Sequence, residues 1–343
     1  MTNPEPNSPA RSADRWGIVL SGGNGTRLRD WIYHRRADYL PKQYLNFIGT
    51  RSMLEHTLHR AEKLIPAQQL FLVITKGHLQ YNEVRRQTAS RPQECVIVQP
   101  ENKDTGPGVL LPLLHLYKRS PDAAVALFPA DHFILEEDLF IQHVERAFKI
   151  VESSRARIVL LGTEPSDWRP GSGYVLTGER SENAALDGRR IEMFVDIPPP
   201  DAAKNMMSKR ALWNTLILIV TCKTLLQAIT RATPELYRSF EPIQEAIGTP
   251  EEQRVSERVY PKLPSVNFAE GVLKNLSYEN RQNLRVLPVR GLTWSDWGTG
   301  DRVSRTLRRL GAPDLVTREA AGSETRPLRV SSGRDSAAAR RIR

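Results

Sequence analysis

Short apolar runs alternate with amphipathic stretches through the first half of the chain. The apolar runs are rich in Val, Ile and Leu, which is typical of buried strands, and the longer stretches between them have helical spacing. The pattern predicts strands at residues 17–20, 70–75, 95–99, 124–129 and 158–162. It predicts helices at residues 52–64, 77–89, 108–118 and 137–151.

Strands that are separated by helices favour an α/β fold. We expect a Rossmann-like, mostly parallel sheet with helices on both faces, because βαβ connections place helices over both sides of such a sheet. Ligands of these sheets bind beyond the carboxyl ends of the strands. Residues 21–28 and 129–132 follow the first and the fourth predicted strand, so they lie where a ligand is expected.

The second half of the chain is less regular but continues the same types of element. It predicts strands at residues 191–195, 212–220 and 284–289, and helices at residues 224–231, 234–247 and 251–259. We expect one domain over residues 16–312. A polar, proline-containing N-terminus, 1–15, and a basic tail, 313–343, have the composition of disordered segments.

The net charge of +10 suggests a nucleic-acid partner, but its distribution argues against one. Residues 301–343 hold eleven arginines against five acids, so six of the ten excess charges lie there, and no aromatic residue accompanies them. No specific nucleic-acid binding is therefore expected. Two distant cysteines, Cys95 and Cys222, and the lack of a membrane-length apolar run or a signal-like segment favour a cytoplasmic protein without a membrane partner.

A glycine-rich loop follows the first predicted strand: residues 21–28 read SGGNGTRL. Glycines allow backbone amides to close around an anion, and three are present, Gly22, Gly23 and Gly25. Arg27 can bind phosphate oxygens with its forked guanidinium, and Lys42, in the segment PKQ, can add a point charge. The loop matches neither the dinucleotide fingerprint nor the Walker A pattern. An ordinary turn is the alternative interpretation.

Two aspartates are candidates for a metal site. Asp131 lies in the segment PADH after the fourth predicted strand, and Asp296 lies in the segment WSDWG. Mg²⁺ in proteins is usually held by one or two carboxylates together with phosphate oxygens, which agrees with a nearby phosphate loop. A helix cap for Asp131 and a turn for Asp296 are the structural alternatives.

These motifs, in this order, resemble those of the sugar-1-phosphate nucleotidyltransferases, also called nucleotide-sugar pyrophosphorylases. The resemblance is greatest to the mannose-1-phosphate guanylyltransferases, and it covers about residues 16–305. The matching segments are residues 21–28, 41–43, 99–107, 129–132, 171–174, 194–198, 213–216 and 294–298. The resemblance implies the nucleotide-diphospho-sugar transferase type of fold. It also implies transfer of a nucleotidyl group, with GTP and mannose 1-phosphate as the favoured substrates, to give GDP-mannose and pyrophosphate.

The resemblance also assigns roles to residues. Arg27 and Lys42 would be catalytic through contacts with the leaving phosphates, and Asp131 and Asp296 would hold Mg²⁺. The nucleotide would be bound by Gly22, Gly23, Gly25, Thr26, Asn102, Thr105 and Gly108. The sugar would be bound by Gly173, Tyr174, Asp196 and Asn214. His132 is interpreted as structural, because the reaction has no obligatory proton transfer.

The sequence departs from the family pattern mainly in the segments that are expected to bind the sugar. Ile197 stands where the family has lysine, and Leu216 stands where it has glycine. A basic insert, residues 29–40, is interpreted as a solvated lid, with contact to pyrophosphate as the alternative. A transferase for another sugar 1-phosphate, and a nucleotide-sugar-binding regulatory relative without catalysis, are therefore alternatives. The oligomeric state stays open, with a homodimer as one option.

Overall fold

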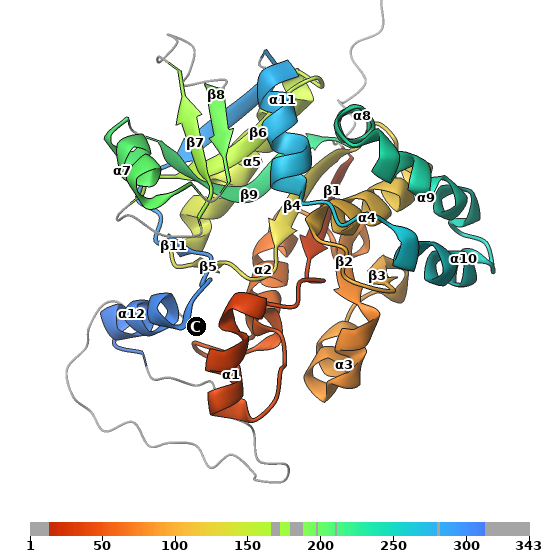
Figure 1. Cartoon of the computed structure of the whole chain (residues 1–343), viewed down its shortest axis with the longest axis horizontal. Coiled ribbons are helices and arrows are strands. Elements are labelled where there is room, and N and C mark those ends of the chain that lie inside the picture. The colour runs from red at the N-terminus through yellow and green to blue at the C-terminus, as the bar shows by residue number, and fades with distance from the viewer. Residues whose placement is uncertain are drawn as a thin grey trace, which may run out of the picture.

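The computed structural model describes residues 14–165, 172–178, 188–196, 198–209, 211–279 and 282–312 (Figure 1). Its centre is one large sheet, which contains nine strands in this part of the chain. In sheet order they are β3 (Val96–Gln99), β2 (Leu70–Thr75), β1 (Arg15–Leu20), β4 (Ala124–Pro129), β9 (Leu212–Thr221), β6 (Ile158–Thr163), β10 (Leu284–Val289), β8 (Arg189–Val195) and β7 (Tyr174–Thr177). A separate short pair joins β5 (Phe133–Ile134) to β11 (Trp294–Ser295).

The directions of the strands confirm the expected α/β fold with a mostly parallel sheet. Strand β1 pairs in parallel with β2 and β4, β2 pairs in parallel with β3, and β6 with β10. Nothing in the sequence pattern indicated that β9 lies antiparallel between β4 and β6, or that β8 also runs against β10. Strand β9 thereby joins the first half of the sheet to the second.

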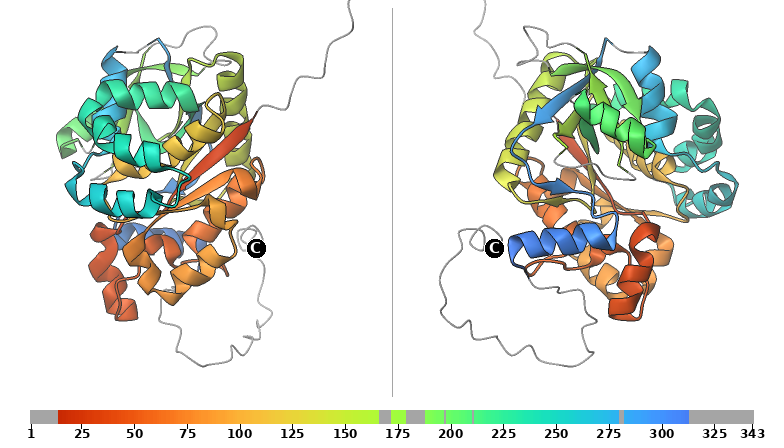
Figure 2. Two further views of the ribbon diagram at one scale, coloured as in Figure 1. Left: turned by 90° about the vertical axis from the view of Figure 1, so that its right-hand side faces the viewer. Right: turned by 60° about the vertical axis from the view of Figure 1, so that its left-hand side comes forward.

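Helices cover both faces of the sheet, as Figure 2 shows. Neighbouring residues of one strand point to opposite faces, so Ile18 and Val19 of β1 belong to different hydrophobic clusters. The cluster that contains Val19 is covered by α1 (Arg29–Arg36), α2 (Met53–Glu62), α3 (Asn82–Ala89), α5 (Glu137–Ser153), α7 (Pro200–Ser208) and α12 (Gly300–Leu310). The cluster that contains Ile18 is covered by α4 (Thr105–Arg119), α8 (Cys222–Ala232), α9 (Pro234–Ala246), α10 (Glu252–Val259) and α11 (Lys274–Glu279).

Some boundaries differ from the predicted ones for local reasons. The predicted helix at 77–89 begins at Asn82, because residues 76–80 form a 3₁₀ turn. Arg15, expected in the N-terminal segment, is the first residue of β1, where its guanidinium lies 2.6 Å from the carboxylates of Glu145 and Glu152. Residues 1–13 and the tail 313–343 lie outside the described part of the chain.

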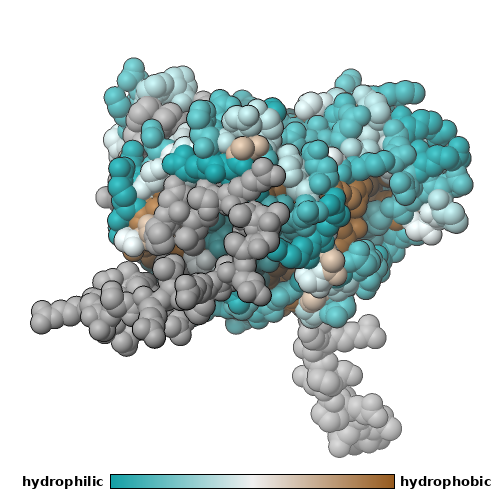
Figure 3. Space-filling model, turned by 90° about the horizontal axis from the view of Figure 1, so that it is seen from below, coloured by the Kyte–Doolittle hydropathy of each residue, from teal (hydrophilic) through white to brown (hydrophobic). Residues whose placement is uncertain are grey.

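The basic insert after the glycine-rich loop, which was interpreted as a solvated lid, contains helix α1. Its Ile32 is buried in the core, while several of its basic residues are exposed. Helix α1 lies beside α12 (Figure 1), and the contact is close because a Cβ at Gly300 would lie 2.0 Å from Trp31. No helix of the described residues is long and apolar enough to span a membrane. Seen from below, the surface is mainly hydrophilic, with apolar residues in small areas (Figure 3).

Candidate functional site

A cleft of about 660 Å³ opens at the carboxyl ends of β1 and β4. Most of the site residues expected from the sequence line it, although they come from segments far apart in the chain. They are Gly22, Gly23, Gly25, Thr26, Arg27, Asn102, Thr105, Gly108, Asp131, Gly173, Asp196, Asn214 and Asp296. Two expected residues, Lys42 and Tyr174, do not line the cleft.

The carbonyl groups of the glycine-rich loop are held by side chains from outside the loop. The Nε2 atom of Gln43 donates to the carbonyls of Ser21 and Gly23, both at 2.8 Å. The Oγ1 atom of Thr75 donates to the carbonyl of Gly22, also at 2.8 Å. Because C=O and N–H point in opposite directions across a trans peptide, the following amides point away from these donors. The loop can therefore present amides to an anion.

Two glycines of this loop are required by the structure. A Cβ at Gly22 would lie 2.3 Å from Nε2 of Gln99 and 3.2 Å from Oγ1 of Thr75. Gly25 has a φ of +61°, in the left-handed region that favours glycine. By contrast, a Cβ at Gly23 would meet no atom within 4 Å. The glycines thus serve close packing at position 22 and the turn at position 25.

A buried histidine that the sequence interpretation missed supports the same loop. His78 shares a hydrogen bond of 3.0 Å between its Nε2 and Oδ1 of Asn24, and its Nδ1 lies 3.1 Å from the hydroxyl of Tyr44. Burial lowers the pKa of His78 to about 4, so the ring is neutral at pH 7. The hydroxyl of Tyr44 also lies 3.0 Å from the carbonyl oxygen of Ser21. In the sequence, the only sign that Tyr44 and His78 support the loop was the position of Tyr44 directly after the PKQ segment.

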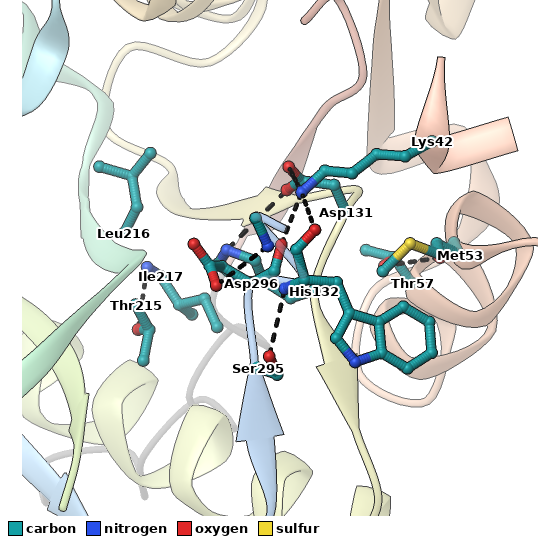
Figure 4. Close-up of polar contacts among 12 residues, drawn as sticks. Lys42, Met53, Thr57, Asp131, His132, Thr215, Leu216, Ile217, Ser295 and Asp296 are labelled. Atoms are coloured by element: carbon teal, nitrogen blue, oxygen red, sulfur yellow. Dashed lines mark hydrogen bonds and ion pairs between the residues drawn. The ribbon is translucent and has the colours of Figure 1, made fainter. Parts of the chain in front are cut away.

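Lys42 joins the two segments that carry the candidate metal ligands. Its Nζ lies 3.0 Å from Oδ2 of Asp131 and donates to the backbone carbonyl of Asp296 at 2.5 Å (Figure 4). The residue is only 5% exposed. This corrects the expected position of Lys42: its charge faces a carboxylate in the wall and does not face the open cleft.

Asp131 and Asp296 are both ionised at pH 7. Burial raises the pKa of Asp131, but its neighbours, chiefly the Lys42 ammonium, together outweigh burial and hold the pKa below its usual range. For Asp296, burial is likewise outweighed by the charges of Arg302 and Lys42, so its pKa is also lowered. The Oδ1 atom of Asp296 accepts from Nη1 of Arg302, and its Oδ2 lies 3.6 Å from Nη2 of Arg27. Arg302 belongs to α12 and was not predicted as a site residue.

The two carboxylates fit the requirements of Mg²⁺ when phosphate oxygens complete its ligands. The described residues contain no group of three acidic, histidine or cysteine side chains placed to bind a metal by themselves. Asp131 and Asp296 line the same cleft and carry negative charge, which matches the one or two carboxylates that Mg²⁺ takes beside phosphates. The donor set therefore suits a metal that arrives with a phosphorylated substrate.

His132 has the environment of a structural residue. Burial lowers its pKa to about 4, so it is neutral at pH 7. Its ring packs edge-on against Trp294, with 5.1 Å between centroids, and Nε2 lies 3.8 Å from Oδ1 of Asp131. The backbone carbonyl of His132 accepts from Arg60 at 3.3 Å. These contacts anchor the segment that carries Asp131.

The loop before α4 docks on a segment near residue 267. The amide of Phe268 donates to Oγ1 of Thr105 at 2.8 Å, and the amide of Gly106 donates to the carbonyl of Val266 at 2.7 Å. Asp104 caps α4 through its side chain and has a φ of +69°. Three further residues of the cleft had no signal in the sequence: Ser265, Asn267 and Ala269.

Gly173, Asp196 and Asn214 form a compact group that lines the same cleft. A Cβ at Gly173 would lie 3.2 Å from Oδ1 of Asp196 and 3.4 Å from Cβ of Asn214. The amide of Asn214 donates to the carbonyl of Gly173 at 2.9 Å. Tyr174 is fully buried in the core, so the structure places its side chain away from the cleft. Ile197 lies outside the described residues.

Curated sequences with similarity to this chain include several guanylyltransferases. A mannose-1-phosphate guanylyltransferase 2 of Escherichia coli O157:H7 is 25% identical over 82% of this chain and 58% of its own length. The mannose-1-phosphate guanylyltransferase RfbM of Salmonella typhimurium is also 25% identical, over 82% of this chain and 56% of its own length. The chain thus spans a little over half the length of these curated relatives.

A crystal structure described as a mannose-1-phosphate geranyltransferase from Thermus thermophilus superposes with a TM-score of 0.71. It is 23% identical, and the match covers 88% of this chain and 80% of that one. This likeness supports the fold. The family model described as nucleotidyl transferase matches residues 16–306, which include most of β1, the glycine-rich loop and Asp296. The chain belongs to the nucleotidyl transferase family.

Proposed function

We propose that the protein transfers a nucleotidyl group from GTP to mannose 1-phosphate, with GDP-mannose and pyrophosphate as products. The observation that carries this proposal is the meeting of three kinds of group in one cleft. These are a loop with amides available to phosphates, a pair of ionised aspartates, and a compact polar group around Asn214. The choice of GTP and mannose is supported by the names of the curated relatives.

The reaction places most of the catalytic work on positioning and charge. An oxygen of the sugar phosphate attacks the α-phosphorus, and the bond from the α-phosphorus to the oxygen bridging to the β-phosphate breaks, which releases pyrophosphate. The amides of the glycine-rich loop and Arg27 would hold the leaving phosphates. Arg27 is suited to this because its side chain is 53% exposed and lines the cleft.

The sugar phosphate would be held beside the two aspartates. Asp131 and Asp296 would hold Mg²⁺, which neutralises phosphate charge when bound. Lys42 would position the two aspartates and would not bind the substrate itself, because it contacts the side chain of Asp131 and the backbone of Asp296. Asn214 and Asp196 would bind sugar hydroxyls from the group that they form with Gly173.

A panel of nucleoside triphosphates against sugar 1-phosphates, with Mg²⁺ present, tests this proposal through pyrophosphate release. We expect the greatest kcat/KM for GTP with mannose 1-phosphate or a close derivative of it. Arg27→Ala and Asp131→Asn should each lose most of this activity. Near wild-type rates in both variants would contradict the site assignment.

Leu216 gives one observation in favour of a second candidate, a nucleotide-sugar-binding protein without turnover. Its side chain lines the cleft where the family has no side chain at all. Equilibrium binding of GDP-mannose, with no pyrophosphate released from any pair in the panel, would favour this second candidate. The paired carboxylates argue for catalysis, since binding a finished nucleotide sugar does not require them.

A further inference from the structure

Strand β9 contains a bulge where Asn214, Thr215 and Leu216 line the cleft. Its pairing with β6 joins Leu218 to Leu160 and Asn214 to Gly162, so residues 215–217 oppose the single residue Leu161. A bulge of this kind redirects the side chains that it contains. Bulges are common beside active sites for that reason.

The bulge is fixed by its own side chains. Oγ1 of Thr215 donates to the carbonyl of Leu161 at 2.5 Å and accepts from the amide of Ile217 at 3.2 Å. Oδ1 of Asn214 accepts from the amide of Leu216 at 2.9 Å. Asn214, which is expected to bind the sugar, therefore also holds the backbone of Leu216 in place.

Leu216 has a backbone conformation that branched side chains rarely adopt. Its φ is +55°, in the left-handed region, and the residue is half-buried. Figure 4 shows its side chain turned to the opposite side of β9 from that of Ile217. Leu216 lines the cleft, whereas Ile217 is buried in the core. Strain that is retained beside a binding site points to a role in binding.

We propose that Leu216 selects the sugar by giving the cleft an apolar wall, so that the preferred substrate is a deoxy sugar 1-phosphate. This inference rests on the proposed function and narrows its substrate class. A sugar hydroxyl facing Leu216 loses its hydrogen bonds to water and gains none, whereas a deoxygenated edge buries apolar surface. The remaining hydroxyls would bind Asp196 and Asn214, which are polar residues of the same cleft.

The side chain of Leu216 is backed by the hydrophobic core. It packs against the large cluster that covers this face of the sheet, and Ala269, a member of that cluster, also lines the cleft. A hydrophobic wall discriminates by about 10- to 100-fold against an added hydroxyl, so hydroxylated mannose 1-phosphate remains a slower substrate. The preference is thus graded and can be measured.

The test compares mannose 1-phosphate with its four monodeoxy forms, at C2, C3, C4 and C6, by kcat/KM for pyrophosphate release. We expect the wild-type protein to prefer one deoxy form by about tenfold or more. Leu216→Ala removes the branched group but keeps a Cβ on the left-handed backbone, and Leu216→Gly also removes the strain. Both variants should lose the preference, and Leu216→Gly should melt at a higher temperature than Leu216→Ala.

The matched control is Ile217→Ala, in the same bulge. It should lower the melting temperature, because it leaves a cavity in the core, but it should keep the sugar preference. If wild type prefers mannose 1-phosphate to all four deoxy forms, or both Leu216 variants keep the wild-type ranking, the inference is overturned while the proposed function stands. If wild type releases no pyrophosphate with any sugar 1-phosphate, the proposed function fails, and the inference fails with it.

Discussion

Lys42 and Asp131 form an ion pair, with 3.0 Å between Nζ and Oδ2, in which Lys42 is buried and Asp131 faces the cleft. The same Nζ donates to the carbonyl of Asp296, so one ammonium group connects both candidate metal-binding segments. The relative position of the two aspartates therefore depends on a residue that does not itself line the cleft.

Replacing Lys42 by methionine should remove this connection and leave Asp131 without its counter-charge. Lys42 is buried and contacts both candidate metal-binding segments, so we expect a lower melting temperature and a large loss of pyrophosphate release. The pKa of Asp131, now held down by Lys42, should rise, and the acid limb of the pH–rate profile should move to higher pH. The double variant Lys42→Met with Asp131→Asn should recover stability without activity. A stable single variant with the wild-type acid limb would contradict this account.

Arg302 should act as a positioning residue for Asp296. Its Nη1 donates to Oδ1 of Asp296, and both side chains are largely buried. Loss of a hydrogen bond to a charged group costs about 1.5–3 kcal/mol, so Arg302→Ala should lower kcat/KM about 10- to 150-fold. The apparent Mg²⁺ affinity should change as well, which can be measured by titrating the metal. Arg302→Lys should recover part of the rate, and Arg308→Ala, on an exposed turn of α12, should have no effect.

Gly22 and Gly23 offer a matched pair of substitutions in the phosphate loop. The Cβ of Gly22→Ala would lie 2.3 Å from Nε2 of Gln99, so the loop or Gln99 must shift. We expect a lower melting temperature and weaker triphosphate binding. The Cβ of Gly23→Ala meets no atom within 4 Å, so its melting temperature should match that of wild type. Equal stability losses in the two variants would show that Gln99 does not pack against the loop in this way.

The two buried histidines should make the protein less stable as pH falls. Burial lowers the pKa of His78 and that of His132 to about 4, against about 6.5 in the unfolded chain. Between these values the unfolded state binds protons that the folded state does not, so this stability is full above about pH 6.5 and is lost as pH falls toward 4. Denaturant unfolding at pH 7 and pH 5 measures this loss. His78→Gln should reduce the difference between the two pH values, and the exposed control His59→Gln should not.

The sequence predicted the part of the fold that repeats one pattern. Strands β1, β2 and β4 are buried on both faces, so each appears as a continuous apolar run next to an amphipathic helix. Strand β9 was found as a strand, but its direction is set by pairing across the sheet and leaves no periodic signal. Helix α12 was missed because most of its surface is polar or basic and only a narrow side, with Val303 and Leu307, is buried.

The candidate site divides in a similar way. Motif residues such as Asp131 and Asn214 could be located because each stands at a strand end or within a characteristic segment. The residues that support them could not, because His78 and Arg302 act through contacts that only the folded chain creates. Lys42 was identified as a site residue, but the direction of its side chain was not predicted. A sequence does not tell whether an ammonium group points into a cleft or toward the residues that line it.

The orientation of the amides in the glycine-rich loop depends largely on residues outside the loop. Gln43 and Thr75, which hold its carbonyls, lie about 20 and 50 residues further along the chain. Two proteins can therefore share the same glycine-rich segment and differ in phosphate affinity when these distant donors differ. A homologue that keeps the glycine-rich segment is therefore expected to keep its phosphate affinity only if it also keeps the side chains that donate to the loop carbonyls.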